Sequence, residues 1–252
     1  RVTFGTLGIW ILVIVFNIPL PRSRIAISSG ALLGLTNMAI PFILISWSET
    51  YIDSGLAGIL TATTPLFTIV IAHLYLGNDK ITPPKLAGIL IGFSGVVLLF
   101  SRDLNPHRLS GNIWAQLAVM GACFSYGVFG VYTKLNLGDQ HPITISAISL
   151  TMTMLLMWIL TPIVEGSLTW PQRPLTWAAT AWLGVIGTAL AYPLLYFLIH
   201  TWGPTRTVLV SYVIPFVAVT LGVILLGEVL DFKLVLGGLL VVVGVGIVNW
   251  KR

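Results

Sequence analysis

The sequence predicts an all-α membrane protein, a polytopic helical bundle made of two inverted five-helix repeats. Three observations carry this prediction: a strongly apolar composition, long apolar segments separated by turn residues, and an internal repeat. Of the 252 residues, 56% are hydrophobic and 8% are charged, whereas soluble domains are about a quarter charged. Mean hydropathy is +0.97. These values exclude a soluble domain, and a net charge of +5 spread thinly along the chain excludes a nucleic-acid-binding surface.

Nine apolar segments are long enough to span a bilayer, which takes about 20 residues. Turn-forming residues such as Pro19, Pro21, Asn105 and Pro106 separate them. No connection is long enough for a soluble domain, so residues 1–252 are predicted to form one transmembrane domain. The predicted spans are 2–20, 25–47, 55–76, 84–101, 110–134, 142–164, 175–201, 205–227 and 233–250.

The distribution of basic residues predicts the orientation of the spans. The first span is followed by its stronger basic flank, Arg22 and Arg24, so it is interpreted as a true span with a cytoplasmic carboxyl end and not as a signal peptide. Alternating the spans from there places eight Lys and Arg residues inside and five outside. This agrees with the positive-inside rule and puts the C-terminus in the cytoplasm of a plasma (inner) membrane.

The internal repeat aligns residues 57–98 with residues 207–248, without a gap, at an offset of 150 positions. Pro65 aligns with Pro215, and Gly88 with Gly238. Identities fall on helix breakers and small residues, where backbone geometry tolerates least change. Because each copy holds two long apolar runs, the repeat indicates a duplicated membrane domain.

The same offset extends upstream, where Gly34 aligns with Gly184. The fifth span, 110–134, then has no counterpart, and the chain starts without methionine. We therefore expect one helix upstream of Arg1 and ten helices in the intact protein, with a first repeat over 1–101 and a second over 109–252. Because five is odd, the second repeat would be inverted relative to the first, as in secondary transporters.

Two motifs carry a resemblance to a known family. One is an internal proline followed by LLGE at 225–228, a short turn and a glycine-rich last span; the other is TPLFTIVIAHLYLGND at 64–79. With these motifs, essentially the whole chain resembles the EamA family of the drug/metabolite transporter superfamily. The resemblance implies a central cavity lined by the second, third, fifth, seventh and eighth spans present here. Asn78 stands where that family usually has glutamate, so the first half lacks a counterpart of Glu228.

Polar residues on two spans are candidates for the cavity wall. In the seventh span, Gly184, Thr188, Tyr192, Tyr196 and His200 recur every four residues and so share one face. We predict that Thr188, Tyr192 and Tyr196 contact substrate, with packing in the interfacial aromatic belt as the alternative for the tyrosines. His200 is either a solvated or headgroup-facing imidazole or a proton relay. In the second span, Asn37 lies near mid-membrane and makes either a substrate contact or a bond between helices.

Prolines mark predicted breaks. Pro65 and Pro215 each remove a backbone donor and free a carbonyl one turn earlier. Helices broken at matching places in two halves indicate a transport site, and Pro41 with Pro193 forms a second, looser pair. The four prolines are predicted hinges, with simple kinking to fit the bundle as the alternative. The residues beside the first pair that we predict to line the cavity are Thr64, Ser211 and Tyr212.

The remaining polar positions are less distinctive. Gln116, Ser125 and Tyr126 are the interior polar residues of the fifth span and are predicted to contact substrate, although Gln116 could also meet headgroups. His73 is expected to be satisfied or solvated. The single cysteine, Cys123, excludes an internal disulfide and is interpreted as a packing residue. Glu228 is expected to bond backbone amides at the start of the last span, with a coupling role as the alternative.

No Asp, Glu, Lys or Arg lies in the middle third of any predicted span. This favours neutral, zwitterionic or aromatic solutes, such as amino acids or drugs, over strongly charged ones. The sequence also has no HExxH motif, paired buried aspartates or P-loop, so we expect no catalytic residue, metal or cofactor. The predicted function is a secondary transporter or exporter that works by alternating access, with a small solute and the lipid bilayer as partners. Proton coupling and oligomeric state stay open, and the alternative function is a lipid-handling or structural membrane protein.

Overall fold

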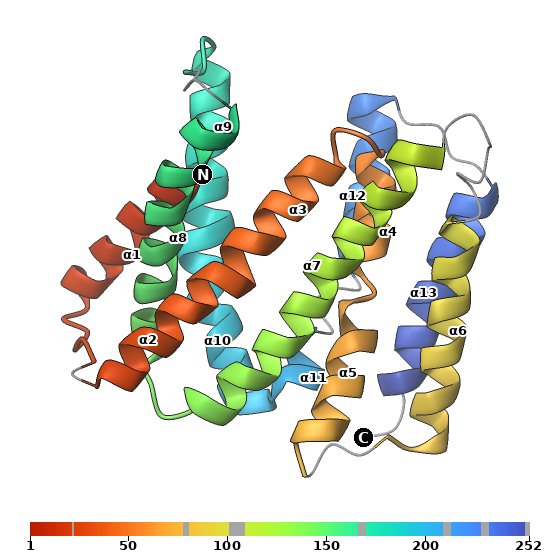
Figure 1. Ribbon diagram of the computed structural model, residues 1–252, viewed down its shortest axis with the longest axis horizontal. Helices are drawn as coiled ribbons and strands as arrows, with labels where there is room; N and C mark the ends of the chain where they lie inside the picture. Colours follow the sequence, from red (N-terminus) through yellow and green to blue (C-terminus); the bar gives the residue numbers. More distant parts are fainter. Residues whose placement is uncertain are drawn as a thin grey trace. The chain divides into compact units, whose positions relative to one another are not determined.

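The computed structural model describes residues 1–21, 23–77, 81–100, 109–165, 170–208, 213–227 and 232–249 (Figure 1). Within these ranges the regular structure is helical and no strand occurs. Five helical segments are long and apolar enough to cross a membrane: Arg24–Ser48, Ser54–Tyr75, Ile113–Asn136, Pro142–Ile163 and Pro174–Trp202. The predicted all-α membrane fold is confirmed.

The helices follow the predicted spans. In the first half they are α1 (Val2–Val15), α2 (Arg24–Leu33), the π-helical turn η1 (Gly34–Ala39), α3 (Ile40–Ser48), α4 (Ser54–Thr61), α5 (Thr64–Tyr75) and α6 (Pro83–Phe100). In the second half they are α7 (Leu109–Asn136), α8 (Pro142–Glu165), α9 (Pro174–Gly184), the π-helical turn η3 (Val185–Leu190), α10 (Ala191–Trp202), α11 (Pro204–Thr207), α12 (Val213–Leu226) and α13 (Phe232–Asn249).

The first helix is shorter than predicted, because it ends at Val15 instead of reaching residue 20. Asn17 adopts a left-handed backbone conformation with φ of 52°. Its N–H bonds the carbonyl of Ile14 at 3.2 Å, and the N–H of Ile18 bonds that of Val13 at 3.0 Å. This pair of bonds is the Schellman arrangement that closes helix C-termini.

The helices of the two halves begin at matching positions. α9 starts 150 residues after α2, at Pro174 against Arg24, and α11 starts 150 residues after α4, at Pro204 against Ser54. The backbone therefore repeats with the offset seen in the sequence.

The chain divides into two compact units, which are described separately. Unit 1 comprises Arg1–Ile40 and Tyr132–Gly203, and unit 2 comprises Pro41–Val131 and Pro204–Arg252. The chain therefore passes between the units at 40/41, within α7 at 131/132, and at 203/204.

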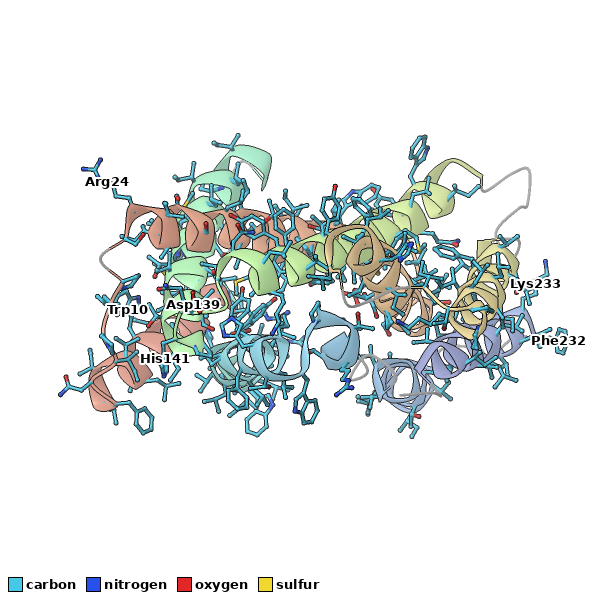
Figure 2. The ribbon with its side chains drawn as sticks, turned by 90° about the horizontal axis from the view of Figure 1, so that it is seen from below. Trp10, Arg24, Asp139, His141, Phe232 and Lys233 are labelled. Carbon is cyan, nitrogen blue, oxygen red and sulfur yellow. The ribbon has the colours of Figure 1, made fainter. Side chains whose placement is uncertain are left out.

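Unit 1 is organised around α1 and α8. The indole of Trp10 on α1, labelled in Figure 2, donates to the hydroxyl of Thr151 on α8 at 3.0 Å. Reciprocally, Trp158 on α8 donates to Thr3 on α1 at 3.1 Å. The early residue of one helix thus meets the late residue of the other, so α1 and α8 run antiparallel. Since they are corresponding helices of the two halves, this is the direction that inverted repeats require.

Unit 2 is held by close contact between α6 and α13, which lie side by side in Figure 1. A methyl group at Gly244 would collide with backbone atoms of Gly88 and Gly92, and one at Gly95 would collide with Gly237. Small residues let two helix backbones approach closely, which drives helix association in membranes. This pair is also antiparallel, and the buried core beside it includes Leu56, Leu60, Leu66, Ile69, Leu99 and Val119.

Candidate functional site

Each half has a π-helical turn inside a long apolar helix, at matching positions. The turn η1 begins at Gly34 and η3 begins at Val185, one residue past the aligned Gly184. Each is followed by one of the predicted hinge prolines, Pro41 in α3 and Pro193 in α10. After η1, the N–H of Ile40 bonds the carbonyl of Leu35, five residues back. Such turns are rare and occur frequently at functional sites. The prolines could be read from the sequence, but the π turns were not predicted.

The first turn is fixed against α8. A methyl group at Gly34 would collide with the carbonyl oxygen of Ser149. The hydroxyl of Thr153 donates to the carbonyl of Gly34 at 2.8 Å, and the hydroxyl of Ser149 donates to that of Gly30 at 2.8 Å. Two side-chain bonds and one close backbone approach therefore hold η1 in place.

The second turn is fixed against α1, the counterpart of α8. A methyl group at Gly184 would collide with the carbonyl of Arg1 and with Phe4. The hydroxyl of Thr188 donates to the carbonyl of Leu183 at 2.9 Å and accepts from Nε of Arg1 at 3.2 Å. The predicted substrate residue Thr188 thus lies, fully buried, in the contact with α1.

Asn37 and Tyr196, predicted separately on two spans, are neighbours in unit 1. Tyr196 is fully buried and Asn37 is 3% exposed. The tyrosine hydroxyl faces the side chains of Asn37 and Ser149, yet it has no hydrogen-bond partner within the described residues. The ring of Tyr192 lies 6.2 Å from that of Tyr196, measured between centroids. Because both tyrosines are buried, they do not form a lipid-facing belt.

The expectation of one shared face on the seventh span is wrong in part. Gly184 and Thr188 face α1, whereas Tyr196 faces Asn37 of η1 and Ser149 of α8. The physical reason is η3, because a π turn takes up one more residue per hydrogen-bonded ring than an α-helix does and so rotates everything after it. Residues spaced by four therefore do not share one face along the whole of this span.

In unit 2, the helix break predicted before Pro65 is present between α4 and α5, at Ala62 and Thr63. Pro65 has no N–H to donate to the carbonyl of Thr61. This carbonyl instead accepts a hydrogen bond from the hydroxyl of Thr64 at 2.7 Å. The hydroxyl of Thr63 bonds the carbonyl of Leu60 at 2.7 Å. The thiol of Cys123 lies 3.5 Å from the same Leu60 carbonyl, so this packing residue contacts the chain next to the break.

The other predicted residues of unit 2 are Thr64 at the start of α5 and three residues of α7. Thr64 is 6% exposed and Gln116 is fully buried. Gln116 follows Ala115, whose carbonyl accepts the hydroxyl of Ser48 at 2.8 Å. Ser125 and Tyr126 are half-buried on α7.

Several predictions fall outside the described residues. Ser211, Tyr212 and Glu228 lie there, as do all of residues 209–212 between α11 and α12. Pro215 is the third residue of α12. His73 is satisfied, as expected, because its Nδ1 accepts the N–H of Ile81 at 3.1 Å.

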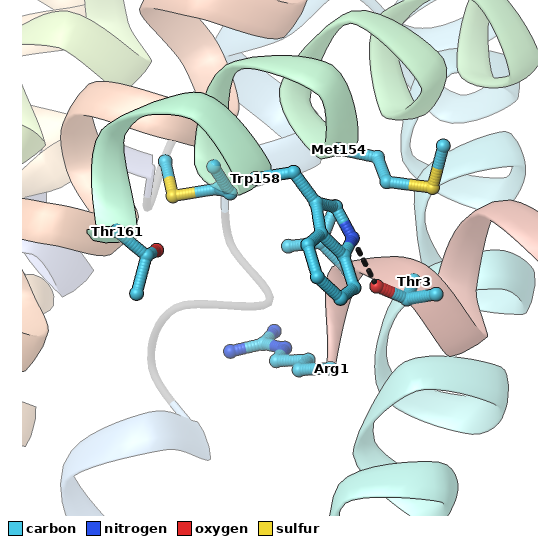
Figure 3. A pocket seen from close by; sticks show the side chains of 7 residues that line it. Arg1, Thr3, Met154, Trp158 and Thr161 are labelled. Atoms are coloured by element: carbon cyan, nitrogen blue, oxygen red, sulfur yellow. Dashed lines mark hydrogen bonds between the residues drawn. The ribbon is translucent and has the colours of Figure 1, made fainter. Parts of the chain in front are cut away.

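A small open pocket in unit 1 was not predicted (Figure 3). It has a cavity volume of about 220 Å³ and lies between the first turn of α1 and the last turns of α8. Its lining comprises Arg1, Val2, Thr3, Met154, Met157, Trp158 and Thr161. Trp170 stacks on Trp177 nearby, with ring centroids 6.0 Å apart. Tryptophans gathered at helix ends are typical of the membrane–water boundary. Nowhere in the described ranges do three or more His, Cys, Asp or Glu side chains gather to hold a metal ion.

Comparison with known proteins identifies a family. Residues 1–101 and 113–250 match the model of the EamA-like transporter family. An uncharacterized transporter of Archaeoglobus fulgidus is 26% identical over 220 residues, covering 87% of this chain and 76% of the relative. A probable terminal-alkyne amino-acid exporter of Streptantibioticus cattleyicolor is 26% identical over 250 residues, covering 99% of this chain and 82% of the relative.

Two further similarities agree with the fold. The uncharacterized inner membrane transporter YedA of Escherichia coli K12 is 28% identical over 207 residues, covering 81% of this chain and 64% of the relative. A solved crystal structure matches 99% of this chain and 84% of its own, with a TM-score of 0.71 and 18% sequence identity. At that identity the match shows the fold alone.

Proposed function

The chain belongs to the EamA-like transporter family, and from that membership we propose that it is a secondary transporter that exports small metabolites by alternating access. The observation that supports this most directly is the pair of π turns at matching positions of the two halves. Interrupted helices in corresponding places are where secondary transporters bind their substrates.

The chemistry of the candidate residues supports an uncharged or zwitterionic substrate. Asn37 supplies an amide, Tyr192 and Tyr196 supply phenols, and no charged side chain lies in the middle third of any predicted span. Amide and phenol groups orient a polar solute by hydrogen bonds, and the aromatic rings add apolar contact area. A strongly charged solute would need a counter-charge in this environment. Neutral and aromatic amino acids fit this requirement, and one relative is named as an amino-acid exporter.

In this proposal, the two halves form inverted repeats, 1–101 and 109–252, that alternate around a central site. The hinges are the π turns with Pro41 and Pro193 and the break before Pro65, with its counterpart near Pro215. Where a proline removes a backbone bond, the helix bends more easily. We propose an inner-membrane location, which the name of the relative YedA supports, and a cytoplasmic C-terminus, which the excess of basic residues on that side supports.

The test uses the full chain in proteoliposomes loaded with a pool of neutral, aromatic and charged amino acids and other small metabolites. Efflux is followed by mass spectrometry, and the same vesicles carry a fluorescent phospholipid in one leaflet. Efflux of one or more uncharged or zwitterionic solutes, reduced in Asn37→Ala and Tyr192→Ala, is the expected result. Equilibration of the lipid between leaflets without movement of any solute would replace the exporter with a lipid-handling protein.

A further inference from the structure

Two buried polar atoms lie one helical turn apart on α10 in unit 1. They are the hydroxyl oxygen of Tyr196 and Nε2 of His200, and neither has a hydrogen-bond partner within the part of the chain that the structure describes. Leaving a buried donor or acceptor unsatisfied costs about 1–3 kcal/mol. Such an atom in a native protein usually takes a water or an ion or has a functional role. Two such atoms one turn apart form a polar strip on α10.

Two opposite charges act on the imidazole of His200. Lys134, on α7, and Asp139, in the connection between α7 and α8, are the charged groups that act on it. Figure 2 labels Asp139 and, two residues later, His141. The ring of His141 is exposed and its Nδ1 accepts the N–H of Ile143. The ammonium of Lys134 donates to the backbone carbonyl of His200, so it caps the last turn of α10.

This cap joins two of the three segments in which the chain passes between the units. Lys134 is the third residue after the crossing at Val131, and His200 is the third residue before Gly203. Gly203 has φ of 84°, which side-chain-bearing residues rarely adopt. Inside unit 2, a methyl group at Gly130 would lie 3.7 Å from Pro204. The two crossing segments are therefore neighbours within each unit, and the Lys134–His200 bond fixes their separation in unit 1.

From this arrangement we infer that His200 is a proton-operated switch that makes net transport depend on pH. The inference rests on the proposed transport function. A proton delivered by water binds Nε2, the imidazole becomes a cation, and no other bond forms or breaks. The new charge attracts Asp139 and repels the ammonium of Lys134, which then leaves the carbonyl of His200. The last turn of α10 is released from α7, and loss of the proton restores the cap.

The experiment measures the full chain in proteoliposomes, as wild type, His200→Gln and the control His141→Gln. Net efflux of a transported solute and its one-for-one exchange are both followed from pH 5.5 to 7.5. We expect wild type and His141→Gln to change net efflux by about threefold or more across this range, where histidine titrates. His200→Gln keeps exchange and loses the pH dependence of net efflux. If wild-type efflux does not depend on pH, or if His200→Gln keeps the pH dependence, the inference is overturned. Neither result would contradict the proposed transport function.

A second readout does not need a substrate. Amide hydrogen exchange of the peptide covering 199–206, corrected for the intrinsic effect of pH, reports release of the last turn of α10. We expect protection to fall at low pH in wild type and in His141→Gln, but not in His200→Gln. If protection in wild type does not change with pH, or falls equally in His200→Gln, the switch is refuted even when no solute moves. The absence of solute movement by itself would count only against the transport function.

Discussion

The hydroxyl of Thr153 donates a hydrogen bond of 2.8 Å to the carbonyl oxygen of Gly34, at the first residue of the π turn η1. The single proton of this hydroxyl is shared with the carbonyl of Ser149, 2.7 Å away within its own helix. At the other π turn, Thr188 bonds the carbonyl of Leu183 beside η3. A buried threonine of the second half therefore bonds the backbone at each of the two π turns.

Replacing Thr153 by valine keeps the volume and removes the hydroxyl. The carbonyl of Gly34 then loses its side-chain donor, and we expect the free energy of unfolding to fall by about 0.6–1.7 kcal/mol, the range for hydrogen bonds between membrane helices. Equilibrium unfolding in mixed micelles measures this. Thr180→Val is the matched control, because the Thr180 hydroxyl is exposed and bonds only its own helix. Equal losses in the two variants would show that the Thr153–Gly34 bond does not hold η1.

Substituting Gly34 by alanine tests the close approach between η1 and α8. The added methyl group meets the backbone carbonyl of Ser149, which cannot move aside as a flexible side chain can. We expect a loss of about 1–3 kcal/mol, as for overpacked sites. Gly187→Ala is the control inside η3, where the nearest atom would be a Leu183 methyl at 3.9 Å. Thermal unfolding in detergent compares them, and a Gly34→Ala protein as stable as Gly187→Ala contradicts the packing described.

A parallel comparison applies to unit 2. In Gly244→Ala the methyl group collides with the backbone of Gly88 and Gly92, whereas Gly246→Ala meets nothing within 4 Å. We expect Gly244→Ala to separate α6 from α13 and to lower stability by about 1–3 kcal/mol. Gly246→Ala should be neutral or stabilising by up to about 1 kcal/mol, because alanine favours helix. A higher melting temperature for Gly244→Ala than for Gly246→Ala would show that the α6–α13 contact does not stabilise this unit.

Tyr196→Phe separates a functional hydroxyl from a structural one. The Tyr196 hydroxyl is buried without a partner in the described residues, so removing it relieves a desolvation cost of about 1–3 kcal/mol. We expect stability to be unchanged or higher and solute efflux to fall. Melting temperature and initial efflux rate are measured on one preparation. A less stable protein with normal efflux would assign the hydroxyl to the fold alone.

Much of the fold could be predicted because its signals are compositional. Pro83 and Pro174 lie at or before helix starts, and the offset from Pro65 to Pro215 relates the two halves. The Asn17 cap was missed because a left-handed residue inside an apolar run leaves no hydrophobic periodicity to read. The break before Pro65 was anticipated because a proline removes a specific backbone donor.

The candidate site was harder to predict. A π turn inserts one residue into the register without changing composition, so nothing in GLTNMA or VIGTAL distinguishes it from α-helix. It nevertheless turns Thr188 toward α1 and leaves Tyr196 facing Asn37. Contacts such as Thr153 with Gly34 depend on how two distant helices pack, which spacing along one helix cannot reveal. The contact of Cys123 with the broken helix also depends on the packing of two distant helices, so it could not be predicted either.

The most direct test of the account is the initial rate at which the full chain exchanges a neutral or aromatic amino acid across proteoliposomes, compared between wild type and Asn37→Ala. Asn37 is buried beside Tyr196 and next to the midpoint of η1. We predict saturable exchange in wild type and at least about a tenfold lower rate constant at low solute in Asn37→Ala, about 1.4 kcal/mol of lost binding, with an unchanged melting temperature. Exchange at the wild-type rate in a stable Asn37→Ala protein would contradict a substrate site at the π turn.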